Sequence, residues 1–121
     1  MVNKSTLILG ASLNEIRYSN IAINKLFNSG IPIIAIGKNT GEICGIKIQN
    51  YFPQNIKINT VSIYINVSHQ DQYINSIIKL SPNRVIFNPG TENPKLFKLL
   101  TSNGIECENS CTLALLSTKQ Y

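Results

Sequence analysis

Residues Thr6–Ser19, TLILGASLNEIRYS, decide how the chain folds. The apolar run Leu7–Leu9 is typical of a short buried strand, and the small residues Gly10, Ala11 and Ser12 follow it directly. A strand that passes through small residues into a helix directs backbone N–H groups toward an anion. We interpret the stretch as a phosphate-binding turn, with a plain strand-to-helix connection that binds nothing as the alternative. The polar approach to the helix consists of Asn14, Arg17, Tyr18 and Ser19.

Composition predicts a single globular domain over residues 1–121. Hydrophobic residues make up 43% of the chain and charged residues 14%, which is typical of folded proteins and not of disordered ones. The formal net charge is +5, but the lysines are scattered and aromatic residues are sparse. This balance favours a small anionic ligand over nucleic acid as the partner.

Other function classes find little support. No apolar run approaches the roughly 20 residues that a membrane span needs, and the apolar stretch near the N-terminus is too short for a signal peptide. We therefore expect a cytoplasmic protein without a membrane partner. Three cysteines argue against a disulfide framework. Cys107 and Cys111 lie four residues apart without a second Cys or His pair, so no metal site is expected.

Strand and helix patterns alternate along the whole chain, which is typical of α/β proteins. We predict an α/β fold with a single, doubly wound, parallel five-stranded sheet that is Rossmann-like, with strand order 3-2-1-4-5. The short alternating segment Ile46–Ile48 reads as an apolar edge strand, which is compatible with a homodimer. The predicted strands are Ser5–Leu9, Ile33–Ile36, Thr60–Val67, Arg84–Asn88 and Ile105–Glu108. The predicted helices are Ser19–Ser29, Gln70–Leu80, Pro94–Thr101 and Thr112–Ser117.

Ligands of such sheets bind at the carboxyl ends of the strands, where the strand order reverses. The residues that follow each predicted strand should therefore meet at one edge of the sheet. These are Gly10, Ala11 and Ser12, then Gly37 and Lys38, then Val67 and Ser68, then Asn88, Pro89, Gly90 and Thr91, and finally Asn109.

The pattern argues against an NAD site. The dinucleotide fingerprint G-x-G-x-x-G would fall on Gly10, Ser12 and Glu15, so two of its three glycines are missing. Dinucleotide folds also carry an acidic residue after the second strand, where this chain has Lys38. A lysine suits a ribose phosphate, so NADP or coenzyme A fits better than NAD. No hydride-transfer pattern accompanies the turn, which disfavours NADP.

The sequence resembles the small CoA-binding domain proteins, single Rossmann-like domains similar to the CoA-binding part of succinyl-CoA ligase. The likeness rests on the G-A-S turn, on Asn14, and on the segment Arg17-Tyr18-Ser19 that opens the helix. It continues through the corner at Gly37 and Lys38, the turn FNPGTENP and the closing segment NSCTLALLS, and covers essentially the whole chain.

The resemblance implies that coenzyme A, or an acyl-CoA, lies across the carboxyl edge. Its pyrophosphate would lie near Gly10–Ser12, its phosphorylated adenosine near Lys38, and its pantetheine along Asn88–Thr91. One departure stands out. Many relatives carry a proline at the corner after the second strand, where this chain has Ile36-Gly37-Lys38.

The residues favour binding over catalysis. The related ligase uses a phosphorylated histidine and a second nucleotide-binding domain, and this sequence shows neither. We interpret His69 as a surface or capping residue and Cys111 as a small buried one. The predicted function is non-enzymatic binding of coenzyme A or acyl-CoA, as a sensor, carrier or regulatory subunit. The alternatives are a subunit of an acyl-CoA ligase-type or NADP-using enzyme, and an interaction module whose cleft is vestigial.

Overall fold

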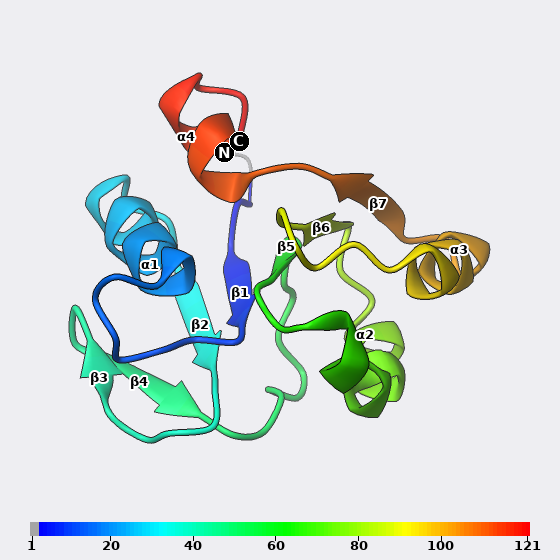
Figure 1. Ribbon diagram of the computed structural model, residues 1–121, viewed down its shortest axis with the longest axis horizontal. Coiled ribbons are helices and arrows are strands. Elements are labelled where there is room, and N and C mark those ends of the chain that lie inside the picture. The colour runs from blue at the N-terminus through cyan, green and yellow to red at the C-terminus, as the bar shows by residue number, and fades with distance from the viewer. Residues whose placement is uncertain (1–2) are drawn as a thin grey trace.

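The computed structural model describes residues 3–121 and contains one mixed sheet between two helical layers (Figure 1). Its strands are β1 (Thr6–Leu9), β2 (Ile33–Ile36), β3 (Glu42–Ile43), β4 (Ile46–Gln49), β5 (Thr60–Ile63), β6 (Arg84–Phe87) and β7 (Glu106–Asn109). The helices are α1 (Tyr18–Asn28), α2 (Ile74–Leu80), α3 (Pro94–Ser102) and α4 (Thr112–Ser117), with 3-10 turns η1 (Val67–His69) and η2 (Asp71–Tyr73). None of the helices within residues 3–121 is long and apolar enough to cross a membrane.

The α/β class is confirmed, but the predicted strand number and order are wrong. Seven strands form the sheet in the order β3-β4-β2-β1-β5-β6-β7. The cause is β4, which pairs parallel with β2 and takes the place that the sequence reading gave to Thr60–Val67. The strand from Thr60 therefore pairs with the other side of β1.

The edge-strand prediction for Ile46–Ile48 is also wrong. β3 pairs antiparallel with β4 and forms the outer edge instead, while Ile48 is buried. The two strands are joined by Cys44 and Gly45, both with positive φ (54° and 77°), a backbone that suits a two-residue hairpin. The first turn residue of the β3–β4 hairpin is thus a cysteine, where Asn or Gly is usual. The argument for a homodimer from an apolar edge no longer holds.

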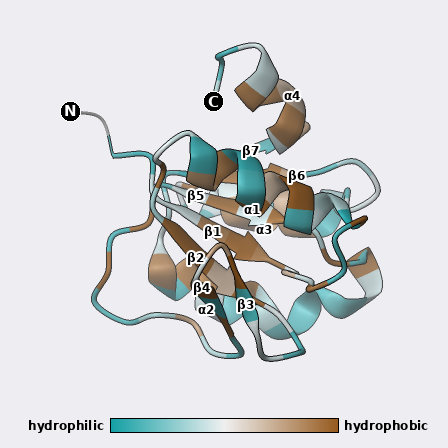
Figure 2. Ribbon diagram, turned by 90° about the vertical axis from the view of Figure 1, so that its left-hand side faces the viewer, coloured by the Kyte–Doolittle hydropathy of each residue, from teal (hydrophilic) through white to brown (hydrophobic). Residues whose placement is uncertain are grey.

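Alternation along β1 explains how the sheet is covered. Leu7 and Leu9 pack into a core with α2 and α3 residues such as Ile77 and Leu96. Ile8 points to the opposite face, into a core with Ile23 and Leu26 of α1. Figure 2 shows the apolar strands enclosed, with the polar parts of α1 turned outward. Full burial of β1 on both faces is what a parallel sheet between helical layers requires.

The third predicted strand ends earlier than expected. β5 stops at Ile63, and Val67 begins a 3-10 turn instead of closing the strand. Asn66 caps this turn, because its side chain accepts a hydrogen bond from the Ser68 amide at 2.9 Å. The predicted helix Gln70–Leu80 is regular only from Ile74 onward.

Strand register brings the carboxyl ends level, as expected for a parallel sheet. Leu9 pairs with Ile36 on one side and with Ile63 on the other. Ile63 pairs with Phe87, and Phe87 with Asn109. The segments that follow these strands therefore leave the sheet along one edge.

Candidate functional site

Two chain segments cross at the start of the carboxyl edge, and glycines permit the crossing. The amides of Gly10 and Ala11 both donate to the carbonyl of Ile36, each at 2.8 Å. A Cβ on Gly37 would lie 2.3 Å from the Ala11 carbonyl oxygen, so only glycine fits there. We call this cluster, made of Gly10, Ala11, Ile36 and Gly37, the glycine crossing.

Gly10 has its own steric requirement. Its φ is +104°, and a Cβ would lie 2.7 Å from the Ile65 side chain and 3.0 Å from the Tyr64 carbonyl. The glycine of the turn is thus explained by backbone crowding. Because the first two amides of the turn already have an acceptor, they are not free to cradle a phosphate.

Free backbone donors lie slightly further along the chain. Within residues 3–121, the amides of Ser12, Tyr18 and Ser19 have no hydrogen-bond acceptor. Tyr18 and Ser19 form the first turn of α1, and the N-cap residue Arg17 offers no side-chain cap. Unpaired amides at a helix start favour an anion. The phosphate donors that this structure offers are therefore Ser12 and the start of α1.

Asn14 shapes the connecting loop. Its side-chain oxygen accepts a hydrogen bond from the backbone amide of Ile16 at 3.1 Å, and the backbone amide of Asn14 donates to the Ser12 hydroxyl at 3.1 Å. The side chain of Asn20 on α1 donates to the Ser12 carbonyl at 2.9 Å and ties the loop to the helix. The predicted site residue Asn14 is exposed and holds the turn instead of lining a cavity.

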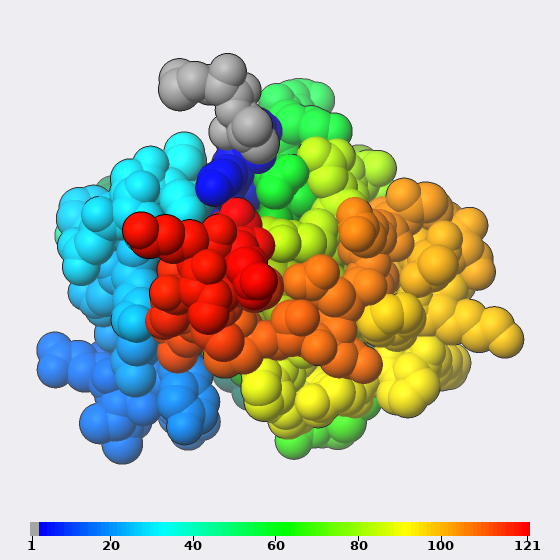
Figure 3. Space-filling view, turned by 90° about the horizontal axis from the view of Figure 1, so that it is seen from above, coloured from blue at the N-terminus to red at the C-terminus, as the bar shows by residue number. Residues whose placement is uncertain are grey.

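Three adjoining cavities run along the carboxyl edge and together form what we call the carboxyl-edge groove. Gly10, Ser12 and Asn66 are shared by the first cavity and the middle one. Tyr18 and Pro89 are shared by the middle cavity and the end one. Figure 3 shows the surface hollowed between the blue segment that follows β1 and the yellow segment that follows β6.

The first cavity, of about 240 Å³, is the cationic end of the groove. Lys38 lies on its wall beside Gly37, as the sequence predicted for the corner after the second strand. His69, which the sequence reading took for a surface or capping residue, lines the same cavity and is exposed. The η1 turn brings His69 to this wall, and a single histidine in the sequence gives no sign that it will line a cavity.

The middle cavity, of about 330 Å³, contains the start of α1. Arg17, Tyr18 and Ser19 line it from one side, and the turn Pro89–Thr91 lines it from the other. This arrangement brings a cation and the free helix amides together. The sequence placed both segments at the same edge, and the structure brings them to one cavity.

The end cavity, of about 240 Å³, carries no charged residue. Asn88, Cys111 and Leu113 line this cavity and neither of the other two. Its remaining wall is shared with the middle cavity. The complete lining is Tyr18, Tyr64, Asn88, Pro89, Cys111 and Leu113. Tyr64 is the one residue common to all three cavities.

Asn88 supports the end cavity from below. Its side-chain nitrogen donates to the Ser62 hydroxyl at 2.8 Å and to the Ile63 carbonyl at 2.9 Å. Its side-chain oxygen accepts from the Thr112 amide at 2.9 Å. The hydroxyls of Ser62 and Thr112 lie 2.8 Å apart and bond to each other. We call Ser62, Ile63, Asn88 and Thr112 the Asn88 network; Asn88 is 1% exposed and binds β5 to the start of α4.

Tyr64 lies beside this network with an unsatisfied hydroxyl. In the described part of the chain, its oxygen is the one buried side-chain polar atom without a hydrogen-bond partner. Burial raises the pKa of Tyr64 to about 12, and the nearby Thr112 and Ser62 hydroxyls offset only part of that effect.

A second group of buried amides fixes the turn after β6. Gln70, 1% exposed, donates to the Thr91 carbonyl at 2.8 Å and accepts from Asn93 at 2.9 Å. Asn93 caps α3 by accepting from the Leu96 amide. The sequence predicted the turn Pro89–Thr91 at the site but gave no sign of Gln70, which reads as an ordinary polar helix residue.

Besides Asn14, two more predicted site residues lie outside the groove. Val67 is 43% exposed at the start of η1 and does not line any of the three cavities. Asn109 is exposed at the end of β7, level with Phe87 but outside the cavity walls. Both were assigned because they follow a strand, and the strand ends alone do not decide which side chains face the groove.

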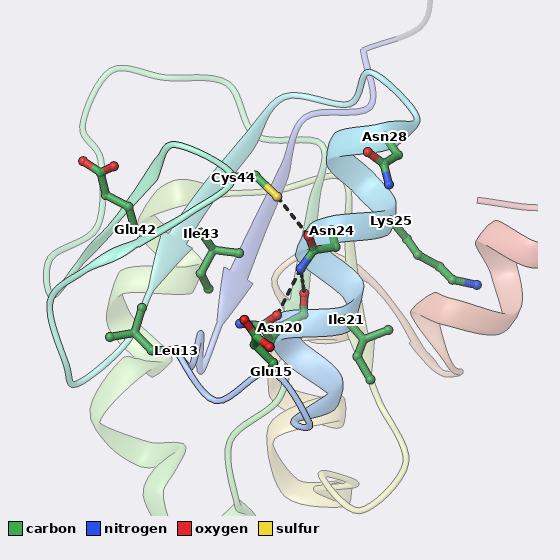
Figure 4. A pocket seen from close by; sticks show the side chains of 10 residues that line it. All are labelled: Leu13, Glu15, Asn20, Ile21, Asn24, Lys25, Asn28, Glu42, Ile43 and Cys44. Carbon is green, nitrogen blue, oxygen red and sulfur yellow. Dashed lines mark hydrogen bonds between the residues drawn. The ribbon is translucent and has the colours of Figure 1, made fainter.

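A separate cavity of about 500 Å³ lies between α1 and the β3–β4 hairpin (Figure 4). Asn24 is at its centre, donating to the carbonyl and side-chain oxygens of Asn20 at 2.9 and 3.0 Å. The Cys44 thiol donates to the Asn24 side-chain oxygen at 3.1 Å. None of the site residues predicted from sequence lines this cavity, which is distinct from the groove.

Comparison with known proteins gives an independent assignment. The family model described as "CoA binding domain" matches residues 4–117. A solved structure titled only as an uncharacterized protein shares 43% identity over the full length of both chains, with a TM-score of 0.94. A search of curated proteins finds no match.

Two more distant structures share the fold. One, titled as cell-free ID.343 from Thermus thermophilus, has 17% identity and a TM-score of 0.85 over 98% of this chain and 91% of the other. A hypothetical protein from Pyrococcus horikoshii OT3 has 23% identity and a TM-score of 0.85 over 96% and 82%. With the family model spanning nearly the whole sequence, the chain belongs to the CoA binding domain family.

Proposed function

We propose that this protein binds coenzyme A or an acyl-CoA in the carboxyl-edge groove, and that it acts by binding and not by catalysis. The observation that carries the proposal is the continuity of the groove, from Lys38 through the free amides at the start of α1 to Cys111. This length and this sequence of chemical environments suit a long ligand that is anionic at one end. Membership of the family supports the identity of the ligand.

The ligand is assigned along the groove by charge. Lys38 and His69 face the first cavity, where they would meet the phosphorylated ribose. Arg17 and the amides of Tyr18 and Ser19 would hold the pyrophosphate in the middle cavity. The pantetheine would run along Pro89–Thr91, and the uncharged end cavity is left for its thiol.

The arrangement of reactive side chains supports binding as the activity. Cys111 lines the end cavity and His69 the first, and these cavities share only Tyr64. A thiol nucleophile needs a base within hydrogen-bond reach. Incubation with acyl-CoA should therefore release no thiol above the uncatalysed rate, and steady turnover would contradict the non-enzymatic role.

Thermal shift and calorimetric titration with coenzyme A and dephospho-CoA test the binding. We expect coenzyme A to bind about tenfold more tightly, because a charge-assisted contact to the extra phosphate contributes about 1.5 kcal/mol. Lys38→Gln should remove that difference. The matched control is Lys57→Gln, which removes another exposed lysine that lines none of the three cavities.

Each outcome has a distinct meaning. Absence of any shift with either ligand would end the proposal. Equal binding of both ligands by the unmodified protein would remove Lys38 from its role while leaving the groove as the site. Gly10 is unsuitable as a probe, because a Cβ there would disturb the fold before it touched a ligand.

A further inference from the structure

The walls of the end cavity differ in chemistry from the rest of the groove. The first cavity has Lys38 and His69 and the middle cavity has Arg17, whereas the six residues that line the end cavity include no ionisable cation or carboxylate. We propose that this cavity selects short, apolar acyl-CoA thioesters over free coenzyme A and over acyl groups that carry a carboxylate. This inference rests on the proposed function.

Neither the Asn88 amide nor the Tyr64 hydroxyl is available to a ligand in the cavity. Asn88 uses its side-chain nitrogen and oxygen on Ser62, Ile63 and Thr112. The hydroxyl of Tyr64 is enclosed by protein, so Tyr64 offers the groove its ring and not its oxygen. A carboxylate placed here would lose its hydration without gaining a cation, which is costly.

Apolar contact comes from the other side chains. Leu113 packs with the α1 core, and Pro89 and the Cys111 thiol add weakly polar surface. Tyr18 is 70% exposed at the boundary with the middle cavity, so a ligand there would cover its ring. These surfaces favour a methyl or methylene group over water.

The size of the cavity limits the acyl chain. Its volume of about 240 Å³ equals roughly eight water-sized volumes, enough for the thioester and a few carbons. Each methylene that becomes buried tightens binding by up to about fourfold. Beyond the cavity a longer chain lies in solvent and gains little.

Calorimetric titration of the full chain with free, acetyl-, butyryl-, succinyl- and octanoyl-CoA tests the inference. We expect butyryl-CoA to bind at least threefold more tightly than acetyl-CoA and at least tenfold more tightly than succinyl-CoA. Octanoyl-CoA should bind within about twofold of butyryl-CoA, since the extra methylenes stay in water.

A cavity-filling variant locates the effect. Cys111→Leu fills part of the end cavity and should abolish the advantage of butyryl-CoA over free coenzyme A. The matched control is Cys107→Leu, which enlarges another half-buried cysteine that packs against the opposite core and lines none of the groove. Cys111 makes no side-chain cap to α4, so the change removes no capping bond.

A second variant covers the case in which Cys111→Leu does not fold. Tyr18→Ala opens the exposed wall and should reduce the butyryl-CoA advantage at least twofold. Tyr51→Ala is its control, because Tyr51 is 65% exposed and lies outside the groove.

The two levels of the proposal fail differently. If neither coenzyme A nor any acyl-CoA binds to the protein, both the proposed function and this inference are wrong. If free coenzyme A binds and all acyl-CoAs bind equally, or succinyl-CoA binds as tightly as butyryl-CoA, the function stands and the inference is overturned.

Discussion

The glycine crossing and the Asn88 network hold opposite parts of the same groove, and they do so by different physics. At the crossing the segments that follow β1 and β2 approach so closely that a Cβ on Gly37 would lie 2.3 Å from the Ala11 carbonyl oxygen. In the network, one buried side chain makes three hydrogen bonds that join β5 and α4. Steric exclusion shapes the first region, and satisfaction of buried polar groups shapes the second.

This difference determines how each region tolerates change. The crossing permits no added atom but depends on no side chain. In the network, each missing atom leaves a buried group without a partner.

Asn88→Ala should lower the free energy of unfolding by about 4 kcal/mol, because the Thr112 amide and the Ile63 carbonyl each lose a buried partner. Urea denaturation measures the loss. Asn88→Asp keeps the acceptor for Thr112 but turns a buried carboxylate oxygen toward the Ile63 carbonyl, so it should not recover the loss. The control Asn28→Ala removes an exposed asparagine of α1 and should change little. An equal loss in the two alanine variants would show that the network does not stabilise the fold.

Gly37→Ala should lower the free energy of unfolding by about 3 kcal/mol, because the backbone of Ala11 has to move away from the new methyl group. Gly30→Ala is the matched control. Gly30 has φ +74° with no atom near its Cβ position, so only the left-handed backbone opposes alanine there, at about 1 kcal/mol. Equal losses of unfolding free energy in Gly37→Ala and Gly30→Ala would indicate that the crowding around Gly37 does not contribute to the destabilisation.

The sequence reveals the two regions unequally. Gly10, Gly37 and Lys38 could be assigned because a glycine or a cation directly after an apolar strand carries a recognisable pattern. Ser62 and Gln70 could not, because a polar residue inside a strand or helix looks the same whether it bonds inward or faces solvent. Ser62 bonds to Thr112, 50 residues away, and Gln70 to Thr91, 21 residues away, and only the fold brings these partners together.

The sheet order was missed for a related reason. The strand at Ile46–Gln49 is short, and its two isoleucines read as an exposed edge. Nothing local in that segment indicates that it pairs parallel with β2 and is then covered by β3. To predict the order, one must know whether β4 or β5 pairs with β2. The connections between the strands decide this pairing, and the residues within each strand do not.

Tyr64 links the two regions, and alkaline pH tests its burial. Its pKa is about 12 against an ordinary value of 10, so the unfolded chain loses this proton first as the pH rises. The stability that comes from keeping this phenol neutral is fully present below pH 10. The free energy of unfolding should then fall by about 2 kcal/mol between pH 10 and 12. Burial also raises the pKa of Tyr121, which adds a decline of the same sign. A flat profile in urea denaturation over this range would contradict the burial of both phenols.

The smallest expected effect has the opposite sign. Tyr64→Phe removes a buried hydroxyl that has no partner and should raise the free energy of unfolding by about 1 kcal/mol at pH 7. It should also remove the Tyr64 share of the alkaline decline. Tyr121→Phe is the matched control, because that hydroxyl bonds to Thr6 and its loss should destabilise the fold. If Tyr64→Phe destabilised the protein as much as Tyr121→Phe, the Tyr64 hydroxyl would have to belong to the Asn88 network, and support by buried hydrogen bonds would extend from that network to the residue that borders the glycine crossing.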